Sequence, residues 1–303
     1  MWRFRVLALA LALALCPLSW APATARAPGS TPPRCVSHLN DPVPALGVLP
    51  FANAPCPGVR PGGLVLTGAE QCTLSFLFRG ADRHIYIATA GHCLLAEEGE
   101  RLWRPGTGPR ARTPDLFAAG IEDEFGIAPV GSAIAGARRG EFPIGEFAYA
   151  RSGNGYEGRD FALIRLDQGV SYSAAVCHFG GPTGVYTYTD KAAPASVAAP
   201  LVFRMYGHGL GVSAGTPART WIGQIPFRDE VAFAWGPGFL GDSGAPVVVD
   251  DGRAVGVMVA INVGGDWGPS ALGSEVIVRL GPAVARAEKV MGIKLTLLTA
   301  PVA

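Results

Sequence analysis

Three residues of the types used in acyl transfer are spread along the chain. His92 ends a run of small residues, Asp160 opens an apolar run, and Ser243 lies in the glycine-flanked sequence Gly-Asp-Ser-Gly. A serine hydroxyl can attack a carbonyl when an imidazole removes its proton and a carboxylate orients that imidazole. Each segment alone is more typical of a turn, a half-buried histidine or the start of a strand. The three together predict covalent catalysis by Ser243.

The order of these residues along the chain distinguishes the classes of enzyme that use a serine, a histidine and an acid. An α/β-hydrolase has its histidine after the serine, whereas the last histidine of this chain, His208, comes before Ser243. A subtilisin would need an acid before the histidine; Asp82 precedes His92, but neither lies in surroundings that resemble that family. The order His92, Asp160, Ser243, with the sequences Ala-Thr-Ala-Gly-His-Cys and Gly-Asp-Ser-Gly, resembles the chymotrypsin/trypsin-like serine proteases.

That resemblance covers about residues 64 to 292 and implies an all-β fold. The expected architecture is two six-stranded antiparallel β-barrels with a short C-terminal helix, and the active site lies in the cleft between the barrels. His92 would be the general base and acid, Asp160 the orienting carboxylate and Ser243 the nucleophile. The backbone N–H groups of Gly241 and Ser243 would form the oxyanion hole. The implied function is a serine endopeptidase that acts as a monomer on protein or peptide substrates through an acyl-enzyme intermediate.

The cysteines are compatible with disulfides in an exported protein. In the family a disulfide clamps the histidine loop, and the resemblance implies that Cys72 and Cys93 are joined. It also implies that Cys177 is tied to an N-terminal segment through Cys35 or Cys56, which leaves one of these three over. A nucleophilic thiol at Cys93 is the competing interpretation.

Specificity is expected to depend on a pocket beside the nucleophile. In trypsin-like enzymes an acid lies six residues before the serine, and this position falls on Pro237. Residues 234–238 contain no acid, so no preference for Arg or Lys is expected. The pocket wall is predicted to pass through Val259, Ala260 and Ile261, whose apolar side chains favour an uncharged substrate side chain.

The chain departs from the family pattern at two positions. Ala245 stands where the commonest motif has another glycine, and an alanine would be strained there if the position required positive φ. Asp242 needs a positive partner if it is buried, because a lone interior carboxylate is very costly. Animal relatives supply a new N-terminus by cleavage before Ile-Val-Gly-Gly. The closest match here, residues 60–63, has a proline after its arginine, so an internal arginine is the expected partner.

Local patterns predict the elements that would carry these groups. From Gly63 onward, short apolar runs are separated by Gly, Asp and Asn, which indicates many short strands. Residues 247–249 and 254–257 flank an Asp-Gly pair suited to the positive φ of a hairpin turn. Residues 282–291 have apolar side chains at helical spacing and are followed by Gly292, which predicts a terminal helix.

The N-terminal region predicts export. Residues 1–27 combine a basic start, a Leu/Ala run and small-residue cleavage sites, as in a secretory signal peptide. The apolar run is shorter than the roughly 20 residues that span a bilayer, so no membrane association is expected after cleavage. Residues 28–61 are rich in proline and are interpreted as a leader or pro-segment, and residues 62–303 as the protease domain. Sparse lysine with abundant Ala, Gly and Pro indicates a bacterial source.

Composition argues against several other classes of function. The net charge is +1 and no basic run stands out, so nucleic acid is not an expected partner. The acidic triplet 122–124 is more typical of a solvated loop than of a cation site, and the other histidines lack ligand spacing. We therefore assign no metal and no cofactor. Two alternatives stay open: a catalytically silent relative that binds a partner through the same cleft, and a secreted serine esterase.

Overall fold

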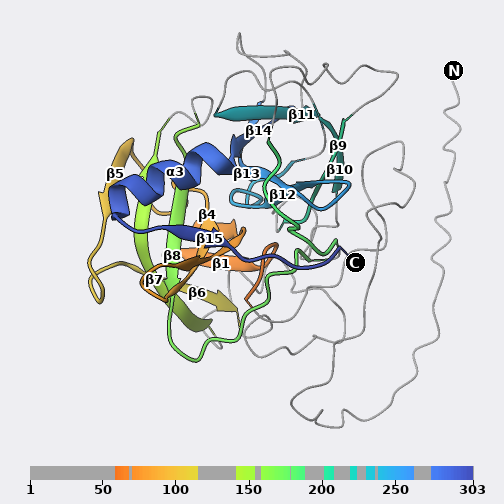
Figure 1. The fold of residues 1–303 in the computed structure, drawn as a ribbon. Helices are drawn as coiled ribbons and strands as arrows, with labels where there is room; N and C mark the ends of the chain where they lie inside the picture. Colours follow the sequence, from red (N-terminus) through yellow and green to blue (C-terminus); the bar gives the residue numbers. More distant parts are fainter. Residues whose placement is uncertain are drawn as a thin grey trace, which may run out of the picture. The chain divides into compact units, whose positions relative to one another are not determined.

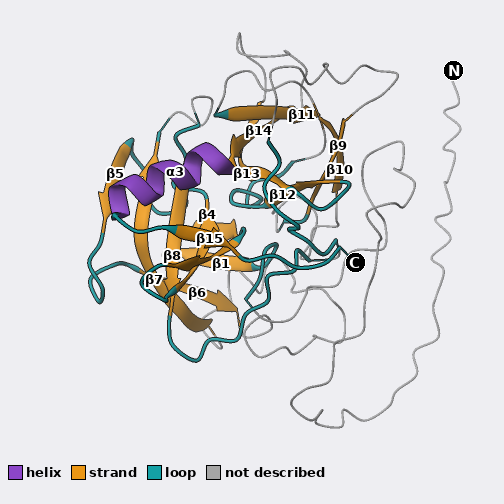
Figure 2. Ribbon diagram, viewed as in Figure 1, coloured by secondary structure: helices purple, strands orange, loops and turns teal. Residues whose placement is uncertain are grey.

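The computed structural model describes residues 59–67, 70–114, 141–153, 158–177, 179–187, 201–207, 219–223, 230–235, 238–262 and 274–302. In this part of the chain strands dominate, and α3 is the one helix (Figures 1 and 2). Several segments and residues considered in the sequence analysis lie outside the described residues. They are the signal peptide 1–27, nearly all of the leader 28–61, the acidic triplet 122–124, Pro237, Cys35, Cys56 and His208.

The first group of strands forms a nine-stranded antiparallel sheet. Its order is β15-β3-β4-β8-β7-β6-β1-β2, and β5 pairs with β7. Strand β8 is buried at all six positions, which explains its apolar sequence apart from Arg165, and Arg165 pairs with the buried Glu146. The strands are β1 (Leu64–Thr67), β2 (Glu70–Thr73), β3 (Leu77–Gly80), β4 (Ile85–Thr89), β5 (Gly99–Leu102), β6 (Arg110–Pro114), β7 (Glu141–Ser152), β8 (Phe161–Leu166) and β15 (Leu295–Leu297).

The second group of strands forms a closed barrel in the order β10-β11-β14-β13-β12-β9. One cluster of its buried side chains includes Phe203, Met205, Val247, Met258 and Ile277. The strands are β9 (Leu201–Met205), β10 (Arg219–Gly223), β11 (Val231–Trp235), β12 (Pro246–Val249), β13 (Ala254–Asn262) and β14 (Ser274–Arg279). Strands β12 and β13 are the hairpin expected after Ser243, and Gly252 in its turn has φ +83°.

These two groups confirm the all-β class expected from the sequence. The second half is a closed six-stranded barrel as expected. The first half differs in detail, because it has nine strands and its hydrogen-bonded path is not closed among the described residues. One of the nine, β15, comes from after the helix and pairs with β3, so the end of the chain returns to the first sheet.

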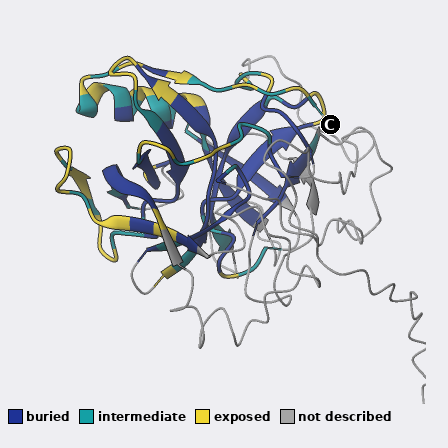
Figure 3. Cartoon of the chain, turned by 90° about the horizontal axis from the view of Figure 1, so that it is seen from below, coloured by how far each residue is buried: buried dark blue, intermediate teal, exposed yellow. Residues whose placement is uncertain are grey.

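Helix α3 (Leu280–Met291) begins two residues before the predicted segment. Its buried residues Leu280, Ala283 and Ala287 lie on one face, and it packs against β13 and β14. Gly292 ends the helix in the left-handed conformation, with φ 68°, and donates its N–H to the carbonyl of Glu288. Figure 3 shows that the strands are largely buried while the outer side of the helix is exposed.

The described region begins inside the segment that the sequence analysis interprets as a leader. Val59 is buried, and its carbonyl accepts a hydrogen bond from the Ser173 amide, so the packed body includes the last residues of the segment interpreted as a leader. None of the helical residues described forms a segment with the length and apolarity needed to cross a membrane.

Candidate active site

Strand pairing brings His92 and Asp160 together. Strand β4 ends at Thr89, just before His92, and β8 begins immediately after Asp160. The two strands are antiparallel neighbours, and Thr89 pairs with Ala162. Residues that follow one strand and precede its antiparallel partner lie at the same edge of the sheet. The loop that bears the imidazole therefore meets the residue that bears the carboxylate.

Three hydrogen bonds fix the buried carboxylate of Asp160 against the histidine loop. Its Oδ1 accepts from the amides of Gly91, at 2.6 Å, and His92, at 2.9 Å. Its Oδ2 lies 2.7 Å from Nδ1 of His92. A carboxylate in this position makes Nδ1 the protonated nitrogen of the neutral ring, which leaves Nε2 as an acceptor.

The free nitrogen of His92 faces Ser243. The distance from Nε2 to the Ser243 hydroxyl oxygen is 2.8 Å, within range for proton transfer. Burial lowers the pKa of His92, but the hydrogen bond and charge of Asp160, with the charge of Glu70, raise it more, so the net pKa lies above the usual value. The arrangement can therefore remove a proton from the serine hydroxyl and hold it on the ring.

The nucleophile turn fits tightly against the first sheet. Gly244, directly after Ser243, has φ +95°, and a Cβ there would overlap the carbonyl oxygen of Thr73 and the hydroxyl of Thr89. The Thr73 amide donates to the Ser243 carbonyl at 2.8 Å, and the Thr73 hydroxyl donates to the Gly241 carbonyl at 2.9 Å. Thr89 in turn donates to the Thr73 carbonyl at 2.9 Å. These contacts connect the turn to β2 and β4.

Sequence reasoning missed both threonines. Thr73 follows Cys72 at the end of β2, and Thr89 ends β4, but neither has a local pattern that distinguishes it from other strand threonines. Thr73 contacts Gly241 and Ser243, more than a hundred positions away, and the Thr89 hydroxyl supports it by donating to its carbonyl. The only sequence signal is their closeness to the histidine motif and its cysteine.

Backbone amides in the turn differ in their hydrogen bonding. The amide of Asp242 donates to the Phe239 carbonyl. The amide of Gly244 donates to the Met258 carbonyl, and that of Ala245 to the Asp242 carbonyl. Within the described part of the chain, the amides of Gly241 and Ser243 have no such acceptor. Gly241 has φ +102°, a conformation that glycine adopts without strain. The amide of the nucleophile residue and that of Gly241, two residues before it, are therefore the candidates for the predicted oxyanion hole.

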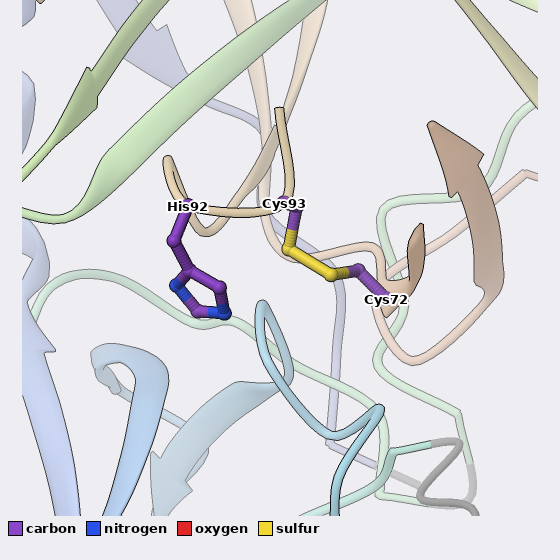
Figure 4. A group of neighbouring side chains, drawn as sticks. All are labelled: Cys72, His92 and Cys93. Atoms are coloured by element: carbon purple, nitrogen blue, oxygen red, sulfur yellow. A yellow bond between two sulfur atoms is a disulfide. The ribbon is translucent and has the colours of Figure 1, made fainter. Parts of the chain in front are cut away.

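Cys72 and Cys93, the pair named in the sequence analysis, form a disulfide beside His92 (Figure 4). Their sulfur atoms and the His92 ring lie close enough together to be considered as metal ligands. A disulfide offers no thiolate, however, and thiolate is the form of cysteine that binds metal or attacks a carbonyl. In this bonded state, Cys93 is neither a ligand nor a nucleophile. Cys177 is also disulfide-bonded, and its partner lies outside the described residues.

The two departures from the family motif have different outcomes. Ala245 does not have positive φ, because Arg83 is the one non-glycine residue with positive φ in the described chain. Ala245 therefore carries no such strain, and its side chain is fully buried in the barrel core. Asp242 is fully buried, and its Oδ2 accepts the Phe239 amide at 2.9 Å. The arginine expected as its partner remains a prediction.

The residues predicted to line a specificity pocket are only partly within the described chain. Val259 is buried, and Ala260 and Ile261 are half-buried near the end of β13. The amide of Gly244 donates to Met258, the residue before Val259, at 2.7 Å. This predicted wall therefore starts beside the nucleophile turn, while Pro237 lies outside the described residues.

Comparison with known proteins gives similarity in fold alone. No protein-family model and no curated protein matches the chain. Among solved structures, Thermobifida fusca protease A is 17% identical over 79% of this chain and 99% of its own, with a TM-score of 0.46. Nocardiopsis protease is 14% identical over 80% and 100%, with a TM-score of 0.43.

An inactivated protease paralogue of the scabies mite is similar to the same degree. It is 15% identical over 76% of this chain and 91% of its own, with a TM-score of 0.47. The solved structures to which the chain is similar in fold are mainly bacterial serine proteases of the chymotrypsin/trypsin-like family.

Proposed function

We propose that the protein is a serine endopeptidase in which Asp160, His92 and Ser243 form the catalytic triad. The observation that carries this proposal is the continuous chain of contacts from Asp160 Oδ2 through both nitrogens of His92 to Ser243 Oγ, at 2.7 and 2.8 Å. Such a chain needs three residue types in one geometry, and packing alone does not require it.

The reaction follows from the position of each proton. As the Ser243 oxygen bonds to the substrate carbonyl carbon, its proton passes to Nε2 of His92, and Asp160 stabilises the imidazolium. The carbonyl oxygen becomes an oxyanion, which the amides of Gly241 and Ser243 stabilise. The C–N bond then breaks as His92 returns the proton to the departing amine, and water repeats the sequence on the acyl-enzyme. Loss of one such donor costs about 10²- to 10³-fold in kcat in a studied enzyme.

The surroundings support a protein or peptide substrate. Leu240, directly before Gly241, is 77% exposed, and it offers an apolar surface to a chain that passes the oxyanion site. We further propose that the mature enzyme is a secreted monomer without metal or cofactor, since its disulfides suit an oxidising compartment.

Labelling with a fluorophosphonate tests the nucleophile, and casein digestion tests the substrate class. We expect the mature protein to be labelled and to degrade casein, and Ser243→Ala to do neither while it keeps its thermal unfolding transition. Labelling without casein or peptide cleavage, but with ester hydrolysis, would identify an esterase. No labelling of the folded protein would identify the silent binding protein and refute the proposal.

A further inference from the structure

Thr73 connects the nine-stranded sheet to the nucleophile turn through two of its groups. It ends β2 and is fully buried. Its main-chain amide donates to the Ser243 carbonyl at 2.8 Å, and its side-chain hydroxyl donates to the Gly241 carbonyl at 2.9 Å. Gly241 and Ser243 are the two residues whose amides are candidates for the oxyanion hole. A single residue of the other sheet therefore binds the carbonyl of each candidate donor residue.

The bond to the Gly241 carbonyl also affects where the Gly241 N–H points. The N–H and the carbonyl of one residue belong to two rigid peptide planes that meet at its Cα, and only φ and ψ relate these planes to each other. Glycine leaves both angles unusually free, and Gly241 adopts φ +102°. Because Gly241 has no side chain to restrict it, its conformation is set by the groups that bind the neighbouring peptides.

The peptide that follows Gly241 is held at both ends. Its carbonyl oxygen accepts from the Thr73 hydroxyl, and its N–H, which belongs to Asp242, donates to the Phe239 carbonyl at 3.0 Å. Loss of the hydroxyl would leave this peptide held at the N–H end by the Phe239 bond, about which it could turn. The Gly241 Cα, and with it the Gly241 N–H, would then be free to shift relative to the nucleophile.

Thr73 is itself fixed in place. The buried hydroxyl of Thr89 donates to the Thr73 carbonyl at 2.9 Å. Gly244 packs so closely against the same carbonyl that a Cβ on Gly244 would overlap it. The branched Cβ of threonine restricts rotation about χ1, which limits the directions that the hydroxyl can take. The group that binds the Gly241 carbonyl is therefore a rigid one.

We propose that Thr73 is a positioning residue for the oxyanion hole: its hydroxyl holds the Gly241 carbonyl and so keeps the Gly241 N–H directed at the oxyanion of the tetrahedral intermediate. This inference depends on the proposed endopeptidase function. The amide contact of Thr73 can be made by almost any residue type, whereas a hydroxyl on so short a side chain requires threonine or serine. A change of side chain at this position therefore isolates the role of the hydroxyl.

The test compares Thr73→Val, which keeps the branched shape and removes the hydroxyl, with wild-type protein on one peptide substrate. We expect kcat to fall by about 10- to 100-fold, because the N–H is displaced and not removed, and KM to stay within about 3-fold. A peptide trifluoromethyl ketone forms an adduct with Ser243 that places an oxyanion in the hole, so its Ki should rise by a similar factor. Thr73→Ser, which keeps the hydroxyl, should have kcat within about 3-fold of wild type.

A defect in the triad would have a different signature. His92 and Asp160 are held by hydrogen bonds of their own, so Thr73→Val should lower the plateau of kcat/KM against pH without moving its acid limb. A shifted limb would assign the defect to the triad and overturn the inference. The matched control is Thr113→Val: Thr113 is buried in the same sheet, but its hydroxyl donates to the Leu64 carbonyl, at 2.8 Å. Its kcat should stay within about 3-fold of wild type.

Fluorophosphonate labelling of wild-type protein separates the two proposals. If wild type is labelled and cleaves peptides while Thr73→Val keeps normal kcat, or while Thr73→Ser is as impaired as Thr73→Val, the inference is wrong and the endopeptidase stands. If folded wild type is neither labelled nor active on any peptide, both proposals fail. Should Thr73→Val not fold, Thr73→Ala and Thr73→Ser provide the same comparison, because they differ only in the hydroxyl, and equal kcat in these two variants would refute the role of the hydroxyl.

Discussion

Arg286 on helix α3 offers a test of how the Asp160 segment is held. Its Nη2 lies 2.7 and 2.8 Å from the two carboxylate oxygens of Glu230, and its Nη1 donates to the Gly158 carbonyl at 3.2 Å. Gly158 precedes Asp160 by two residues. The change Arg286→Gln removes the charge and the contact of Nη2 with both Glu230 oxygens, and with them the tie between the helix and this segment.

The magnitude follows from burial. The side chains of Arg286 and Glu230 are 23% and 35% exposed, so the pair lies between an exposed ion pair, worth about 0.2–1 kcal/mol, and charge-assisted hydrogen bonds, worth about 1.5–3 kcal/mol. We expect Arg286→Gln to lower the free energy of unfolding by about 1–2 kcal/mol. A small displacement of Asp160 should lower kcat about 10-fold, with little change in KM, because the imidazole is then misoriented.

Urea unfolding and steady-state kinetics on one peptide substrate measure both effects. The matched control is Arg253→Gln, because Arg253 pairs with Asp251 at 43% and 54% exposure, away from the Asp160 segment. That variant should lose less than about 0.5 kcal/mol and no kcat. Equal losses in the two variants, or normal kcat in Arg286→Gln despite lower stability, would refute the positioning argument.

Three further predictions concern the candidate active site. Ser243→Ala should abolish peptidase activity, and Ser243→Ala/His92→Ala should lose little more, because the residues act as a unit; additive losses in single-turnover rates would contradict this. The Cys72→Ser/Cys93→Ser variant should lose about 3 kcal/mol in urea unfolding, since the disulfide joins residues 21 positions apart; an unchanged midpoint would argue against the loop-closure estimate. Activity requires neutral His92, so kcat/KM should fall as pH drops through its pKa. This acid limb should lie above the usual value of about 6.5, because Asp160 and Glu70 raise that pKa, and Asp160→Asn should move it to lower pH.

Elements with strong local signals could be predicted from the sequence. The hairpin after Ser243 has an Asp-Gly turn between two apolar runs, and the terminal helix has apolar spacing and a glycine stop. Both are governed by contacts among neighbours in sequence. The order of His92, Asp160 and Ser243 also predicted which side chains meet, because that order is tied to one type of chain path.

Features that depend on distant contacts could not be predicted in this way. Strand β15 has three residues, and its place beside β3 is set by where α3 ends, not by its own sequence. The contacts of Thr73 with the nucleophile turn and of Glu275 with Gly238 arise only when separate strands pair. Periodicity reports which face of an element is buried, but not which remote loop it meets.

The division of the site between two hydrogen-bonded systems has a consequence for activity. His92 and Asp160 belong to loops of the nine-stranded sheet, whereas Ser243 belongs to the barrel. Each sheet is stabilised by its own pairing, but the contact between His92 and Ser243 depends on how the two pack, and Thr73 fixes that packing at the turn. Removal of the Thr73 hydroxyl is expected to leave both sheets intact, because it takes no part in strand pairing, and to free the carbonyl of Gly241, a residue of the proposed oxyanion hole. If the protein is the proposed peptidase, we expect a change at this junction, such as loss of the Thr73 hydroxyl, to lower kcat before it lowers the free energy of unfolding, and kinetics with urea unfolding on one variant would test that order.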